Sequence, residues 1–445
     1  MRGSALLSWK RVALAGAVAT LVATASLLGG VLRNSSSAAP AVAVPRLPSQ
    51  AHLDGGFSTG DTAGLIRQLQ TTLRANPRDA QSYALLGLAY QQRARETGDP
   101  SYYTKAAGVL HRALALAPSD PTATSGLGSL ALARHRFAEG LALGRRARAL
   151  APSSARNYGI IGDALLELGR YDEAFTAFDT MSRLRPNVAS YARVSYAREL
   201  LGRPRAAVAA MKLAVDSATA ELEPTAWAHV QLGKIYWSLG NVAVAARHYR
   251  AALAAFPGYV YALDALAQVE AARARYARAI ALEQRAVAAT PLPQFVATLG
   301  DLYRVTGRPR LARRQYDLIG AIDRLLVANG VRTDLELALF DVDHGIALPR
   351  ALARARRAHA ERPSIEGDDV LAWALARNER CDEALRYSRR ALRLGTLDAL
   401  KFFHRGMIER CLGHATAGRK WLRRALALNP QFSLLWAPVA RQALR

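Results

Sequence analysis

Cysteine is scarce in this 445-residue chain, which contains only Cys381 and Cys411. Two cysteines are too few for a disulfide-rich scaffold, or for a zinc or iron–sulfur site built from several thiolates. Lysine is also rare, because only six of the 60 cationic residues are lysine and the rest are arginine. The net charge of +25 by itself indicates solubility and non-specific association, not a specific nucleic-acid site. We therefore expect no nucleic-acid partner.

Catalytic motifs are missing as well. The sequence contains no H-E-x-x-H helix, no Walker phosphate loop and no G-x-S-x-G nucleophile elbow. Its one acidic and histidine-containing cluster, Asp341–His344, lacks the spacing of a calcium loop and reads as a polar turn between helices. The sequence thus predicts a protein that is not an enzyme and that has no metal site and no cofactor.

The chain is nevertheless able to fold, because 51% of its residues are hydrophobic and 21% are charged. Near the N-terminus, Lys10 and Arg11 precede an uncharged run, Val12–Leu32, which would be about 31 Å long as a helix. We interpret residues 1–33 as a hydrophobic signal-anchor helix, with a cleaved signal peptide as the alternative. The basic flank predicts that the rest lies outside the cytoplasm. The protein would then be a single-pass cell-membrane protein, or secreted or periplasmic if residues 1–33 are cleaved, with residues 34–60 as a Ser/Ala/Pro-rich linker.

A repeat with a period of 34 residues fills most of the chain. Pro118, Pro152 and Pro186 are spaced by 34 and 34 residues, and Pro257 and Pro291 also by 34. Small residues recur at nearly the same period: Gly128, Gly162, Gly233, Ala267 and Gly300. Small residues allow two helices to approach closely, and proline ends a helix, so the spacing predicts stacked helical pairs.

The pattern resembles the tetratricopeptide repeat, a helix–turn–helix unit. One unit that carries the resemblance contains Tyr158, Ile161, Gly162, Leu165, Ala174, Phe178 and Pro186. The resemblance implies an all-α, right-handed α-α superhelix of about ten units over residues 61–441. We divide it into an array at 61–319, a degenerate repeat at 320–363, and C-terminal units at 364–445 that end in a capping helix.

The same resemblance implies a site. In this family the first helix of each unit lines a concave groove that binds proteins or peptides. The positions that face the groove correspond here to Tyr196, Glu199, Trp227, Lys234, Trp237, Tyr261, Asp264, Gln268, Asp301 and Arg304. Trp373 and Phe403 form a second candidate patch. Aromatic side chains beside mixed charges are typical of binding hot spots, although each of these residues could instead pack between repeats.

An alternative function uses the arginine-rich stretches 145–148 and 354–357, which fall in second helices and would face the convex side. Such a face could bind a cell-surface polyanion, either an acidic glycan or lipid headgroups. Polyanion binding would weaken steeply with salt, whereas binding in an aromatic groove would not.

The two cysteines lie near helix ends in two neighbouring repeat units. Cys381 begins a second helix, and Cys411 lies near the end of the next first helix. In a stacked array these ends lie on the same side, so the thiols could form a disulfide; the alternative is two small buried residues.

Overall fold

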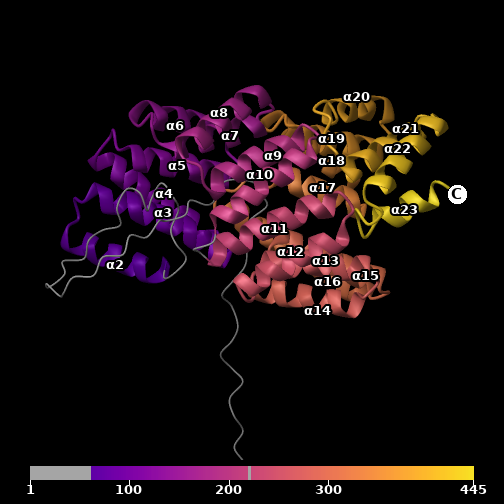
Figure 1. Ribbon diagram of the computed structural model, residues 1–445, viewed down its shortest axis with the longest axis horizontal. Coiled ribbons are helices and arrows are strands. Elements are labelled where there is room, and N and C mark those ends of the chain that lie inside the picture. Colours follow the sequence, from indigo (N-terminus) through magenta and orange to yellow (C-terminus); the bar gives the residue numbers. More distant parts are fainter. Residues whose placement is uncertain (1–61, 219–221) are drawn as a thin grey trace, which may run out of the picture.

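The computed structural model describes residues 62–218 and 222–445. Within these ranges every regular element is an α-helix, and the helices pack into the solenoid shown in Figure 1. The predicted signal or anchor segment (1–33) and linker (34–60) lie outside the described residues. In the described part, no helix combines the length and the apolar character that crossing a bilayer requires.

In the described part of the chain the solenoid contains ten antiparallel hairpins, each a first helix packed on the second helix that follows it. The first helices are α3 Ala80–Thr97, α5 Pro121–Ala133, α7 Ala155–Glu167, α9 Val188–Leu200, α11 Leu222–Ser238, α13 Val260–Ala272, α15 Pro293–Val305, α17 Asp334–His344, α19 Ile365–Arg377 and α21 Ala399–Cys411. The second helices are α4 Ser101–Leu116, α6 Phe137–Leu150, α8 Tyr171–Leu184, α10 Pro204–Ser217, α12 Val242–Ala255, α14 Tyr276–Ala289, α16 Pro309–Ala328, α18 Leu348–Glu361, α20 Cys381–Ala391 and α22 Ala415–Leu428. Helix α2 (Thr62–Ala75) precedes the ten hairpins and α23 (Trp436–Gln442) follows them. The predicted all-helical solenoid of about ten units is therefore confirmed.

The periodic residues act as the sequence predicts. Second helices α4, α6 and α8 end two residues before Pro118, Pro152 and Pro186. First helices α7 and α9 are followed by Gly169 (φ 73°) and Gly202 (φ 64°), which adopt the left-handed conformation that glycine tolerates. Proline and glycine thus mark where these helices stop.

The stacking weakens at one place, between α16 and α17. Helix α16 has 20 residues and is longer than every other second helix. Its extra turns, with Ile319 and Leu326, share a hydrophobic core with Leu69 of α2 and Leu85 of α3. Residues 320–363 thus contain the end of α16 and the hairpin α17–α18, at the point where the chain returns to its first helices.

Successive turns of the superhelix touch each other. The backbone N–H of Ile365 donates to the hydroxyl of Tyr171 at 2.7 Å, and the Arg362 guanidinium bonds the carboxylate of Glu167. Similar contacts join Leu200 to Thr396 and Trp237 to Asn429, and each partner lies 192 to 196 residues further along the chain. At 34 residues per repeat, one superhelical turn takes about six repeats.

Candidate binding surface between superhelical turns

The ten residues predicted to line the groove all lie on first helices. Helix α9 carries Tyr196 and Glu199, α11 carries Trp227, Lys234 and Trp237, α13 carries Tyr261, Asp264 and Gln268, and α15 carries Asp301 and Arg304. The structure brings Tyr196, Glu199 and Trp237 together around one cavity of about 240 Å³.

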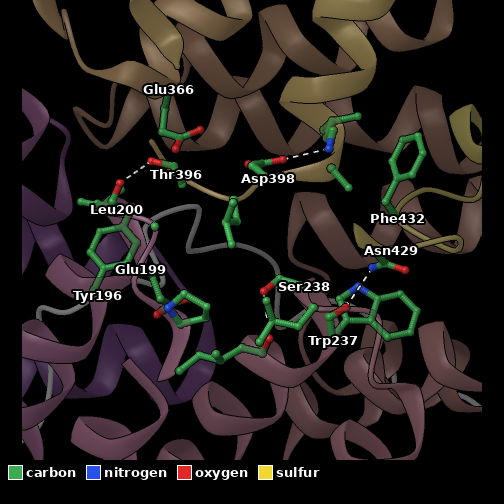
Figure 2. A pocket seen from close by; sticks show the side chains of 17 residues that line it. Tyr196, Glu199, Leu200, Trp237, Ser238, Glu366, Thr396, Asp398, Asn429 and Phe432 are labelled. Atoms are coloured by element: carbon green, nitrogen blue, oxygen red, sulfur yellow. Dashed lines mark hydrogen bonds between the residues drawn. The ribbon is translucent and has the colours of Figure 1, made fainter. Parts of the chain in front are cut away.

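This cavity, here called the inter-turn cavity, lies between α9 and α11 and the repeats of the next superhelical turn (Figure 2). Its far side is formed by Glu366 of α19, Asp398 at the start of α21, and Phe432. Two contacts between the turns hold it in place. The Thr396 hydroxyl donates to the carbonyl of Leu200 at 2.6 Å, and the Asn429 amide donates to the carbonyl of Trp237 at 2.9 Å.

Sequence reasoning identified only one side of this cavity. Glu366, Asp398 and Phe432 were missed because the repeat pattern shows which residues face inward, but not which later repeat covers them. The missing signal was the number of repeats per superhelical turn, which sequence periodicity alone does not contain.

The carboxylates on the far side are organised by one buried lysine. The Lys401 ammonium lies 2.8 Å from Asp398 and 2.8 Å from Glu366. Burial alone would lower the pKa of Lys401, but Asp398 and Glu366 outweigh that effect and raise it well above the ordinary value. The second Asp398 oxygen accepts the backbone N–H groups of Leu400 and Lys401, which caps α21.

Glu199 is in a different position. Among the described residues it makes no hydrogen bond and no ion pair. Burial raises the pKa of the Glu199 carboxyl to about 8, although the nearby charge of Lys234 lowers it. At neutral pH the Glu199 carboxyl is therefore mostly protonated.

Next to Glu199, the inner face continues as a polar line. The Gln268 amide donates to both oxygens of Asp264, at 3.1 and 3.2 Å. Burial raises the pKa of Asp264 to about 6, against the opposing effects of Lys234 and Gln268. Burial also lowers the pKa of Lys234, although Asp264 and Glu199 oppose this.

The remaining predicted residues do not join the inter-turn cavity. The Tyr261 ring packs against Tyr259 and Phe295, and Trp227 packs beside the cores of neighbouring repeats. Asp301 accepts hydrogen bonds from the Tyr316 hydroxyl at 2.7 Å and from His344 at 2.8 Å. It lines a second, largely apolar cavity of about 250 Å³ beside α16 and α17. Arg304 is exposed.

Two other sequence features take part in packing. Trp373 and Phe403, the second candidate patch, are buried, which agrees with the alternative that they pack between repeats. The indole N–H groups of Trp373 and Trp436 both donate to Asp343, at 2.8 and 2.9 Å. Within residues 62–218 and 222–445, no group of three or more His, Cys, Asp or Glu side chains is arranged to hold a metal ion.

The arginine-rich stretches lie on second helices α6 and α18. In α18, Arg354 contacts Asp341 at 3.0 Å and Arg356 contacts Glu383 at 3.6 Å. In α6, Arg146 donates to the carbonyl of Pro118 at 2.9 Å. Much of this charge is therefore engaged within the protein.

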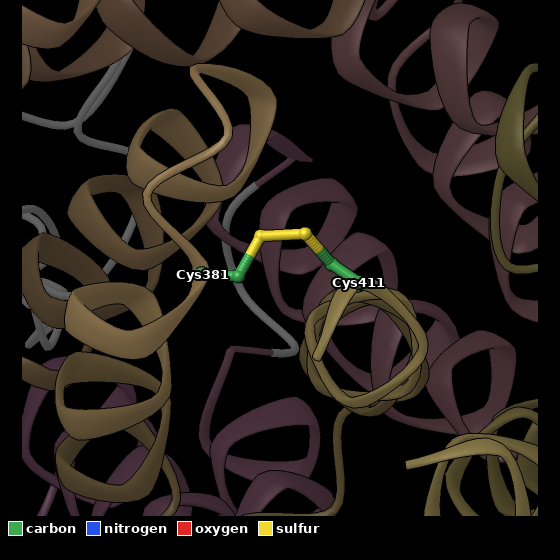
Figure 3. Close-up of a disulfide and its surroundings, with 2 residues drawn as sticks. All are labelled: Cys381 and Cys411. Atoms are coloured by element: carbon green, nitrogen blue, oxygen red, sulfur yellow. A yellow bond between two sulfur atoms is a disulfide. The ribbon is translucent and has the colours of Figure 1, made fainter. Parts of the chain in front are cut away.

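A disulfide joins the two cysteines (Figure 3). It links Cys381, the first residue of α20, to Cys411, the last residue of α21, with 6.1 Å between their Cα atoms. The bond therefore fastens two consecutive hairpins near the C-terminal end.

Comparison with known families gives matches in three stretches. Residues 101–155 and 230–292 match one family model described as a tetratricopeptide repeat, and residues 155–187 match a second model with the same description. No curated protein matches the sequence.

Several solved structures resemble parts of the fold. The Cut9–Hcn1 hetero-tetramer of the APC/C is 15% identical over 85% of this chain and 81% of that chain, with a TM-score of 0.38. A tetratricopeptide repeat protein from Thermus thermophilus is 23% identical over 45% of this chain and 99% of that chain, with a TM-score of 0.37. A tetratricopeptide repeat protein from Parabacteroides merdae is 14% identical over 52% of this chain and 87% of that chain, with a TM-score of 0.40.

Proposed function

We propose that the chain is a non-enzymatic scaffold whose partner binds at the inner surface, because residues 101–187 and 230–292 match tetratricopeptide repeat models and proteins with such repeats generally bind proteins or peptides. The single observation that carries this proposal is the inter-turn cavity. Three inner-face residues, Tyr196, Glu199 and Trp237, line a hollow large enough for a side chain, and one of them is an acid without a bonding partner among the described residues.

The proposed location is outside the cytoplasm, anchored by or released from residues 1–33. The disulfide between Cys381 and Cys411 supports this proposal, because disulfides persist in oxidising compartments and are rare in the cytosol. The basic and apolar character of the N-terminal sequence, which lies outside the described residues, supports it as well.

Partner capture tests the binding site. The tagged full chain would be cross-linked in its native cell envelope beside two variants, Trp237→Leu in the inter-turn cavity and Leu213→Ala on α10. Leu213 is 49% exposed and does not line the cavity, so it controls for loss of any surface hydrophobic group. We expect Trp237→Leu to lose a protein partner that the wild type and Leu213→Ala retain.

The polyanion alternative predicts a different result. If the partner were an acidic glycan or lipid headgroup bound by α6 and α18, capture would survive Trp237→Leu and would fall steeply between about 50 and 200 mM salt. That pattern would contradict the cavity as the binding site. The ion pairs of Arg354 and Arg356 argue against it, because arginines that are already paired are less available to a polyanion.

A further inference from the structure

The lining of the inter-turn cavity is rich in acids, in contrast to the composition of the whole protein. The chain has 60 Lys and Arg against 35 Asp and Glu, for a net charge of +25. Yet, counting only described residues, the cavity lining contains three carboxylic acids, Glu199, Glu366 and Asp398, and no lysine, arginine or histidine. In so basic a protein, a group of three acids is unusual, and it offers more than one carboxylate to an entering cation.

Only part of this acidity is neutralised from within. Lys401 contacts both Glu366 and Asp398, so one ammonium serves two carboxylates. Glu199, on the opposite side of the cavity, has no hydrogen bond or ion pair among the described residues. A cation that entered the cavity would therefore favour the charged form of Glu199 and pair with it once its proton has left.

Aromatic rings complete the lining. Tyr196 and Trp237 lie on the same side as Glu199, and Phe432 faces them from the next superhelical turn (Figure 2). A lysine ammonium or arginine guanidinium is attracted to the faces of such rings, and its methylene stem packs against them. Acids together with aromatic rings are thus complementary to a basic side chain, and not to an anion or a purely apolar group.

We propose that the inter-turn cavity binds a basic side chain, lysine or arginine, presented by the partner peptide. This inference rests on the proposed function and adds the chemistry of the partner. The volume of about 240 Å³ accommodates one such side chain, so the cavity would recognise a single basic residue of the bound peptide.

The ionisation of Glu199 makes binding depend on pH. Burial raises the pKa of Glu199 to about 8 in the empty cavity, and an entering cation would favour its charged form, so binding would release a proton. Lys234 lies near Glu199 without lining the cavity, and its charge favours ionised Glu199. Glu366 and Asp398 line the cavity with Tyr196, whose pKa burial raises well above its ordinary value. Affinity for a basic residue is therefore expected to rise from pH 6 to pH 8 and to level off above that.

Defined peptide libraries test the proposal on the full chain. The probes are heptapeptides with blocked termini and random flanks free of charged residues. Their central residue is fixed as lysine, arginine, norleucine or acetyl-lysine. Wild type is compared with Glu199→Gln, and with Glu139→Gln on α6, an exposed acid that does not line the cavity. Thermal unfolding of each variant verifies that it is folded.

We expect the wild type and Glu139→Gln to retain lysine or arginine peptides about tenfold more strongly than norleucine or acetyl-lysine peptides at pH 8. Glu199→Gln should lose most of this preference and its dependence on pH. A preference that persists in Glu199→Gln would overturn the proposal, because the basic residue would then bind elsewhere.

The two proposals fail in distinguishable ways. In one outcome the wild type binds all peptides equally, whatever their central residue, and Trp237→Leu binds none of them. That result would overturn the basic-residue inference but would still support the proposed scaffold function. If no library bound to any form of the protein, the basic-residue inference would be overturned, together with peptide binding as the form of the proposed function.

Discussion

At the scale of single residues, glycine in the first helices allows the two helices of a hairpin to touch. A Cβ atom on Gly162 would lie 2.3 Å from the ring of Phe178, which is fully buried. Gly233 stands in the same relation to Tyr249 in another repeat. The glycine period seen in the sequence is therefore a packing requirement.

Replacing Gly162 by alanine should destabilise the protein, because the buried Phe178 ring has to move to make room. We expect a loss of about 1–3 kcal/mol, seen as a lower unfolding midpoint in a denaturant titration followed by circular dichroism. Gly108 of α4 is the matched control, because a Cβ there meets nothing within 4 Å. Gly108→Ala should be neutral or stabilising by up to about 1 kcal/mol. Equal losses for both variants would contradict this explanation.

Glu199 should make stability depend on pH. Its folded pKa of about 8 lies above the unfolded value near 4.5, so the folded state holds its proton more tightly. Between these values the folded state binds more protons, and the stability that Glu199 contributes falls as pH rises. We expect Glu199→Gln to melt above the wild type by a margin that grows from pH 5 to pH 8.5. A constant margin would show that Glu199 ionises normally.

At the scale of elements, the disulfide fastens two consecutive hairpins. It closes a segment with a sequence separation of 30 residues, for which chain-entropy estimates give about 3–4 kcal/mol. The double variant Cys381→Ser/Cys411→Ser should therefore unfold at a lower denaturant concentration than the oxidised wild type. A reducing agent should destabilise the wild type but not the variant. Alkylation of both thiols in native, unreduced protein would contradict the bond.

The elements were the part of the structure that the sequence predicted best. Pro118, Pro152 and Pro186 follow helix ends, and the small residues lie where helices cross, because both roles are local. Trp373, named as part of a second candidate patch, instead packs between repeats, which was the alternative. Its burial depends on Trp436 of α23, which packs against it at 5.5 Å between ring centroids, and this contact is not visible in the repeat pattern.

At the scale of the whole molecule, the superhelix is closed by contacts between its turns. The Arg362 guanidinium bonds Glu167, 195 residues earlier, and Glu336, at 2.8 Å, and all three side chains are largely buried. The degenerate stretch 320–363 contains Arg362 and Glu336. This stretch, which departs from the repeat pattern, therefore also contacts the first superhelical turn.

Arg362→Gln should loosen this closure, because it leaves two buried carboxylates without their cation. We expect a loss of about 3–5 kcal/mol and a larger radius of gyration in small-angle X-ray scattering. Arg170→Gln is the control, because Arg170 and Glu173 form an exposed pair within one helical turn, and such pairs contribute at most about 1 kcal/mol. An Arg362→Gln protein that keeps both its stability and its dimensions would contradict the closed superhelix.

The closure between turns is also what the sequence could not predict about the candidate site. The resemblance to the tetratricopeptide repeat predicted that Tyr196, Glu199 and Trp237 line the groove, but Glu366, Asp398 and Phe432 reach them only through the winding of the array. Winding depends on small rotations that accumulate over about six repeats, and no single residue encodes them.

The central claim is that the partner contacts the cavity between the turns. Site-specific photo-cross-linking tests it most directly, with a photoreactive residue placed at Ser238, which lines the cavity, or at Leu213, which does not. After illumination in the native envelope, we predict that a partner peptide is joined to the protein at position 238 and not at position 213. Cross-links only at position 213, or equally at both, would contradict the claim.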